Sequence, residues 1–90
     1  MTEEDFQQKV IDVVGVDSYN AITTNTQKSK IVYLRMIFAQ FYHSLGLSLH
    51  SIGDKINKCH STIVYYLKKF DIECEYNKDF RNLVNKILKE

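Results

Sequence analysis

Apolar residues recur every three or four positions along nearly the whole chain, and this spacing constrains the fold more than any other feature. The clearest case is residues 28–45, KSKIVYLRMIFAQFYHSL. Its apolar face consists of Ile31, Leu34, Ile37, Phe38, Phe41 and Leu45. A repeat of this length is typical of an α-helix, and no stretch shows the alternation of a half-buried strand. The sequence therefore predicts an all-α fold, a small helical bundle with residues 28–45 as its long central helix.

Four further helices are predicted around the central one. Thr2 with Asp5, Ser48 and Asn77 stand where N-caps of the first, third and last helices are expected. The inward faces are Phe6, Val10, Val13 and Val14; Leu49, Ile52 and Ile56; Ile63, Leu67 and Phe70; and Phe80, Leu83, Val84, Ile87 and Leu88. Residues 17–26, DSYNAITTNT, are polar and rich in turn formers, so a loop is predicted there.

Length and composition bound the class of protein. Ninety residues, 44% of them hydrophobic, predict one folded domain over residues 1–90. Neither a membrane-spanning run nor a secretory signal is recognisable, so a cytoplasmic protein without a membrane partner is expected. Cys59 and Cys74 have no C-x-x-C spacing, which predicts reduced thiols and neither a disulfide framework nor a zinc knuckle.

Charge is segregated along the chain although the net charge is only +1. Residues 18–70 contain seven basic side chains and a single acidic one, whereas the two ends together carry an excess of acidic residues. The basic residues are Lys28, Lys30, Arg35, Lys55, Lys58, Lys68 and Lys69. A basic middle between acidic ends favours one face of the molecule for binding a polyanion.

The stretch LSLHSIGDKINKCHSTIVYYLKKF, residues 47–70, predicts a helix-turn-helix. Two short apolar periodicities are separated by the break NKC, and Gly53 suits a close helix crossing. Helical phase places Tyr66 inward with the apolar face of the second helix. The outward residues are Ser61, Thr62, Tyr65, Lys68 and Lys69. Hydroxyl groups at a helix start can bind base edges or phosphates, and lysines neutralise phosphates.

The same stretch resembles the signature of the C-terminal DNA-binding domain of the bacterial replication initiator DnaA, which runs close to LSLPEIGxxFGGRDHSTVLHAxxKI. The likeness extends to KSKIVYLRMIFAQFY, similar to that family's central helix, and to NKDFRNLVNKIL, similar to its closing helix. The resemblance implies a helix-turn-helix that reads a short duplex box as a monomer. It also implies a basic loop ahead of the central helix that touches the minor groove.

The resemblance suggests which residues contact DNA. His60, Ser61 and Thr62 match the family's base and phosphate contacts, and Lys58 stands where the family has arginine. Cys59 occupies the place of an aspartate that reads bases, and Asn57 replaces a Gly-Gly pair. The full set of expected DNA-binding residues is Lys28, Lys30, Arg35, Ser48, Lys58, Cys59, His60, Ser61, Thr62, Tyr65, Lys68 and Lys69.

Two other classes of function compete with DNA binding. An enzyme is not expected, because the chain has no phosphate-binding loop, carboxylate pair or activated nucleophile, and no cofactor or small-molecule substrate is implied. The adjacent Cys59 and His60 have no third ligand at a useful spacing, so no metal site is predicted from them. The alternative is a protein-interaction domain that keeps the fold and has lost DNA binding. Two features favour it: Cys59 stands in place of the aspartate, and the basic loop has only Lys28 and Lys30 and no arginine.

Overall fold

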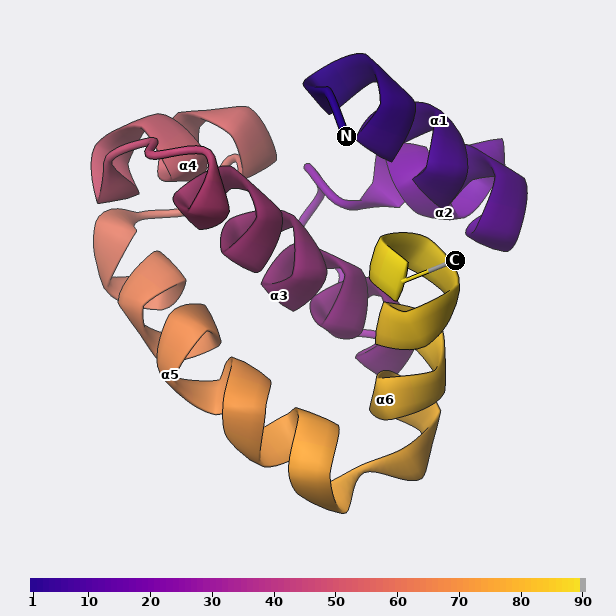
Figure 1. The fold of residues 1–90 in the computed structure, drawn as a ribbon. Helices are drawn as coiled ribbons and strands as arrows, with labels where there is room; N and C mark the ends of the chain where they lie inside the picture. The colour runs from indigo at the N-terminus through magenta and orange to yellow at the C-terminus, as the bar shows by residue number, and fades with distance from the viewer. Residues whose placement is uncertain (90) are drawn as a thin grey trace.

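The computed structural model describes residues 1–89. This part of the chain is helical and contains no strand, which confirms the predicted all-α fold (Figure 1). The helices are α1 (Glu3–Val14), α2 (Val16–Ala21), α3 (Ser29–Ser44), α4 (Leu49–Ile56), α5 (His60–Tyr76) and α6 (Lys78–Val84), and α6 continues into a single π-helical turn, η1 (Asn85–Lys89). The three principal dimensions of the molecule, 28, 27 and 26 Å, are nearly equal.

Helix α3 runs through the middle of the molecule, with α5, α4 and α6 packed around it (Figure 1). All six residues 34–39 are buried, so the helix is enclosed on every side at its centre instead of exposing a polar face. The predicted apolar stripe is correct except at its end. Leu45 is 48% exposed, because α3 stops at Ser44 and the chain turns away at Gly46, where φ is +90°. Tyr42, which the predicted stripe leaves out, is buried.

Helix α1 begins with the predicted cap. The Thr2 hydroxyl accepts a bond from the Asp5 amide, and the Asp5 carboxylate accepts one from the Thr2 amide, which together form a capping box. The helix is anchored by Phe6, whose ring stacks on Phe41 at a centroid distance of 4.0 Å.

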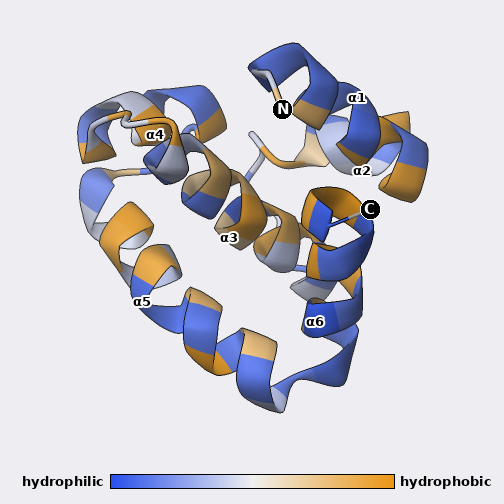
Figure 2. Cartoon of the chain, in the orientation of Figure 1, coloured by the Kyte–Doolittle hydropathy of each residue, from blue (hydrophilic) through white to orange (hydrophobic). Residues whose placement is uncertain are grey.

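Figure 2 shows the apolar stretches of α3 and the alternating polar and apolar stretches along α5.

Helix α2 was predicted as loop, and that prediction is wrong. Six residues form too few hydrogen bonds to be stable alone, so the local pattern gave no helix signal. Tertiary packing stabilises the segment: Ile22 is buried, and the Tyr19 ring lies 6.0 Å from that of Phe38. The helix places the following residues, 22–28, beside α3.

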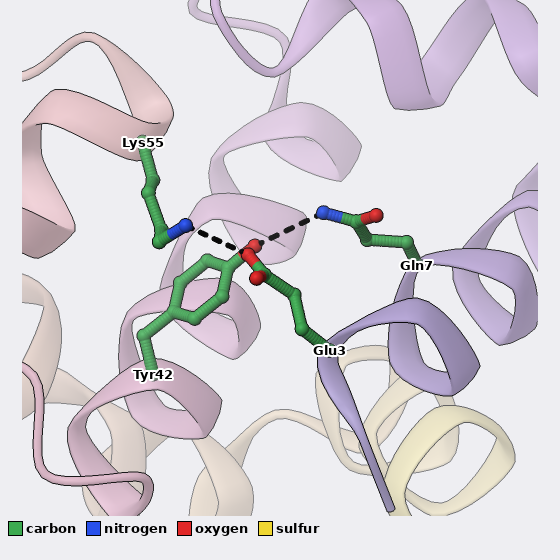
Figure 3. A network of polar contacts seen from close by, with 4 residues as sticks. All are labelled: Glu3, Gln7, Tyr42 and Lys55. Atoms are coloured by element: carbon green, nitrogen blue, oxygen red, sulfur yellow. Dashed lines mark hydrogen bonds and ion pairs between the residues drawn. The ribbon is translucent and has the colours of Figure 1, made fainter.

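A polar network joins α1 to α3 and α4 (Figure 3). The Lys55 ammonium lies 2.9 Å from the Glu3 carboxylate and 5.3 Å from the centre of the Tyr42 ring. The Gln7 amide donates to the Tyr42 hydroxyl at 3.5 Å. The hydrogen bond to Lys55 lowers the pKa of Glu3, whereas burial raises the pKa of Tyr42. The network fixes the first turn of α1 against α4 and uses one lysine of the basic middle of the chain.

The C-terminal segment closes the core from the other side. The Asn77 side chain caps α6 as predicted, accepting from the Phe80 amide at 3.1 Å and donating to the Tyr33 hydroxyl at 2.7 Å. Phe80 is fully buried, with its ring edge against Phe70 and Tyr33. The buried residues of α1, α3, α4, α5, α6 and η1, together with Ile22, form one hydrophobic cluster. None of the helices in residues 1–89 is both long and apolar enough to cross a bilayer.

Candidate nucleic-acid interface

Helices α4 and α5 are joined by three residues, 57–59, as the sequence predicted. Helix α4 ends at Asn57, which adopts the left-handed conformation with φ 58° and ψ 49°. The amides of Asn57 and Lys58 both donate to the Gly53 carbonyl, the second at 2.9 Å. These bonds turn the chain sharply and start α5 close against α4.

Gly53 makes this close turn possible. It is buried, and a Cβ atom at this position would clash with the carbonyl oxygen of Lys58. Because that oxygen belongs to the backbone of the turn, it cannot move aside as a flexible side chain would. The expected role of Gly53 at a close crossing therefore has a specific atomic cause.

The first turn of α5 presents polar groups outward. Cys59 takes the N-cap position, and its sulfur lies 3.3 Å from the Thr62 hydroxyl. His60 and Ser61 are exposed, whereas Thr62 is half-buried. The hydrogen bond from Thr62, together with amide groups of the helix start, lowers the pKa of the Cys59 thiol. Free helix-start amides, hydroxyl groups and an imidazole are thus gathered at one end of α5.

The next two turns of α5 separate inward and outward faces at the predicted phase. Ile63, Tyr66 and Phe70 are buried, and Tyr65 is 55% exposed. Lys68 is exposed, and the Lys69 ammonium lies 6.0 Å from the centre of the Tyr65 ring. The outward face of α5 therefore combines an aromatic ring with two ammonium groups.

Arg35 was expected on the DNA-contacting surface, and the structure contradicts this. The side chain is 0% exposed. Its guanidinium donates to four main-chain carbonyls of residues 21–26: Ile22 at 2.8 Å, Thr26 at 2.7 Å, Thr24 at 2.6 Å and Ala21 at 3.5 Å. Except for that of Ala21, which also accepts from the Thr24 amide, these carbonyls accept no main-chain hydrogen bond from residues 1–89. Arg35 is buried because its planar guanidinium satisfies several of them at once. Its role is to shape the loop.

The same loop is tied to the helix-turn-helix. The Asn57 amide donates to the Thr23 carbonyl at 3.1 Å, and the Lys58 ammonium lies 3.4 Å from the Thr24 carbonyl. Burial and the nearby Arg35 charge lower the pKa of Lys58. These bonds place the loop after α2 beside the turn that starts α5.

The other expected contacts differ in how free they are. Lys28 is the N-cap residue of α3 and Lys30 lies in its first turn; both are exposed. Ser48 is exposed, but its hydroxyl already accepts from the Ser51 amide at 3.2 Å as the cap of α4. Arg35 is buried, Lys55 is paired to Glu3, and the Lys58 ammonium already donates to the Thr24 carbonyl. The lysines of the basic middle left to meet a polyanion are therefore Lys28, Lys30, Lys68 and Lys69.

Sequence reasoning missed one neighbour of this surface. His50, in the first turn of α4, lies beside His60, with ring centroids 4.8 Å apart. The cap at Ser48 predicts that His50 lies in the first turn of a helix. Its contact with His60 depends on how α4 and α5 pack, which the sequence spacing does not show.

No family model, curated protein or solved structure matches this chain.

Proposed function

We propose that this chain is a sequence-specific double-stranded DNA-binding domain of the replication-initiator type, acting as a cytoplasmic monomer without catalytic activity. One observation carries the proposal: the start of α5 projects an exposed imidazole and two hydroxyl groups from a turn that Gly53 keeps tight, near the exposed Lys68 and the half-buried Lys69. This combination suits a helix that enters a major groove with its first turn.

The proposed docking places the first turns of α5 in the major groove. That groove is about 12 Å wide, enough to admit one helix. His60 and Thr62 would meet base edges, and Lys68 and Lys69 would lie near the flanking phosphates. Lys28 and Lys30, at the start of α3, would extend the contact toward the adjacent minor groove. The support for this second contact is that Arg35, Asn57 and Lys58 hold the preceding loop against the turn before α5.

Binding should depend on salt through the lysines of this surface. Each phosphate neutralised contributes roughly 0.9 to the slope of log affinity against log salt. We expect Lys69→Ala and Lys28→Ala each to weaken binding to every duplex and to flatten that slope by about one. Lys78→Ala, in the exposed first turn of α6, is the matched control and should change neither. Fluorescence anisotropy of a labelled duplex over a salt series gives both quantities. A folded protein with no salt-sensitive duplex binding would contradict the proposal.

Sequence readout should depend on different residues. Selection from random duplex DNA would first define the preferred site. On that site His60→Ala and Thr62→Ala should each lower affinity by about 1–3 kcal/mol, the range of a base-edge contact, and leave binding to random DNA and the salt slope unchanged. Equal losses on preferred and random duplexes would assign these residues to the phosphate backbone and remove them from sequence readout.

Cys59 should set the preference at one base pair. A carboxylate at this position could accept a hydrogen bond from cytosine N4, whereas the thiol is a weak acceptor. We expect Cys59→Asp to sharpen the preferred sequence at one position and to raise the melting temperature, since aspartate is a better N-cap. Cys59→Ser separates the two effects, because serine caps the helix without supplying a carboxylate. An unchanged preferred sequence in Cys59→Asp would show that the position does not read a base.

A second candidate function, a protein-interaction domain, is favoured by the far half of α5. Ile72 is 50% exposed and Tyr76 is 79% exposed, and helical spacing aligns both with Tyr65. Exposed apolar side chains in line are found at interfaces. A double variant, Ile72→Ser with Tyr76→Ser, distinguishes the two functions. If the first proposal holds, this variant binds duplex DNA as tightly as the parent protein does.

A further inference from the structure

His50 and His60 bring two imidazole rings together from separate helices. His50 is the second residue of α4 and His60 the first residue of α5, and the close approach of α5 to α4 at Gly53 lets the two side chains meet. The ring centroids are 4.8 Å apart and the ring planes are inclined by 43°. Both side chains are exposed, so an ion from solvent can reach them.

This separation fits two imidazoles bound to a common metal ion. A zinc–nitrogen bond is about 2.0–2.1 Å long, and a ring centre lies roughly 1 Å behind its nitrogen. Two rings at a tetrahedral angle then have centres about 5 Å apart. Imidazole nitrogen suits zinc, nickel and copper, whereas magnesium and calcium require oxygen ligands. We propose that His50 and His60 together bind a divalent transition metal ion.

The protein supplies two ligands to this ion. Within residues 1–89 no group of three or more histidine, cysteine or acidic side chains has the geometry of a metal site. The Cys59 sulfur, although next in sequence to His60, lies beside the Thr62 hydroxyl at 3.3 Å. Water completes the coordination, so the site binds metal more weakly than a closed four-ligand site and exchanges it readily.

Metal binding has a consequence that rests on the proposed function. The ion would link the start of α4 to the start of α5, and it would take the His60 ring away from base edges. We expect the metal-bound form to be more resistant to unfolding and to bind its preferred duplex more weakly. His60 is thus shared between the metal and DNA.

The test uses the full chain, freed of metal, and zinc chloride as the probe. Zinc should raise the melting temperature in a saturable way and shift the imidazole NMR signals of His50 and His60, while magnesium chloride does neither. His50→Ala and His60→Ala should each weaken zinc binding by at least about tenfold, since even loss of a supporting group outside the ligand set costs that much. His43→Ala, an exposed histidine at the end of α3, is the matched control and should bind zinc as the parent does.

Two outcomes would overturn the metal site. In the first, the His50→Ala variant binds zinc as tightly as the parent. In the second, zinc binding is lost in Cys59→Ser but retained in His50→Ala. A DNA titration separates this inference from the proposed function. Zinc should weaken duplex binding by the parent protein and leave His50→Ala, which keeps His60, unaffected. Parent protein that binds zinc through the two histidines but never binds duplex DNA would contradict the proposed function and leave the metal site standing.

Discussion

Replacing Arg35 with methionine should lower the free energy of unfolding by about 3 kcal/mol or more. The guanidinium makes three bonds of 2.6–2.8 Å to loop carbonyls, and bonds to a charged group are worth about 1.5–3 kcal/mol each. Methionine fills a similar volume but leaves the buried Ile22 carbonyl without a partner. For a chain of this length, with a total stability of about 5–13 kcal/mol, such a loss is large. Urea unfolding followed by circular dichroism measures it.

Two control variants make the Arg35 result interpretable. Arg81→Met removes the other arginine, which is exposed and bonds to carbonyls only at 3.3 and 3.5 Å, and it should cost no more than about 0.5 kcal/mol. Arg35→Lys keeps a charge but not the planar fork, so its loss should be intermediate. If Arg35→Met and Arg81→Met unfold at the same urea concentration, the buried guanidinium does not stabilise the loop.

Gly53→Ala should destabilise the helix-turn-helix, and the sign of its effect is diagnostic. At an uncrowded helix position the change from glycine to alanine stabilises by about 1 kcal/mol. Here the new methyl group meets the Lys58 carbonyl, so we expect a loss of about 1–3 kcal/mol as in other overpacked sites. The turn must also widen, which moves α5 relative to α4 and should weaken binding to the preferred duplex.

The matched control for Gly53→Ala is Asp54→Ala, the next residue of the same helix. Asp54 is exposed, so its replacement tests the effect of a good helix former without the clash, and stability should change by no more than about 0.5 kcal/mol. Thermal unfolding of both variants, with duplex binding measured below the melting range, gives the comparison. A Gly53→Ala variant more stable than the parent would show that the crossing of α4 and α5 has room to spare.

Features set by neighbours in sequence were predicted well. The caps at Thr2, Ser48 and Asn77 depend on bonds between residues three positions apart, and all three form as expected. The choice of Tyr66 over Tyr65 for the core followed from helical phase alone, and the structure confirms it. Such features can be predicted because the interactions that stabilise them join residues close in sequence. Their burial in the core is indicated by the apolar pattern.

Features set by contacts between distant residues were missed. The six-residue helix α2 exists because Tyr19 and Ile22 meet the core, which no local pattern specifies. Arg35 lies on a helix that carries apolar residues on every side at its centre, and the carbonyls to which its guanidinium donates belong to residues 9 to 14 positions away. For the candidate site, the charge pattern located the lysines but did not show which of them other groups already engage.

The way the loop after α2 is fastened leaves its sequence open to change. Arg35, Asn57 and Lys58 all bond to main-chain carbonyls of residues 21–26, and every residue type carries a carbonyl. The exposed side chains of Thr23 and Asn25 can therefore be exchanged without altering the bonds that position the loop. The loop backbone therefore keeps its position whichever side chains it carries. A descendant or a designed variant could acquire arginine there, and with it a new partner preference, without a change in the rest of the molecule.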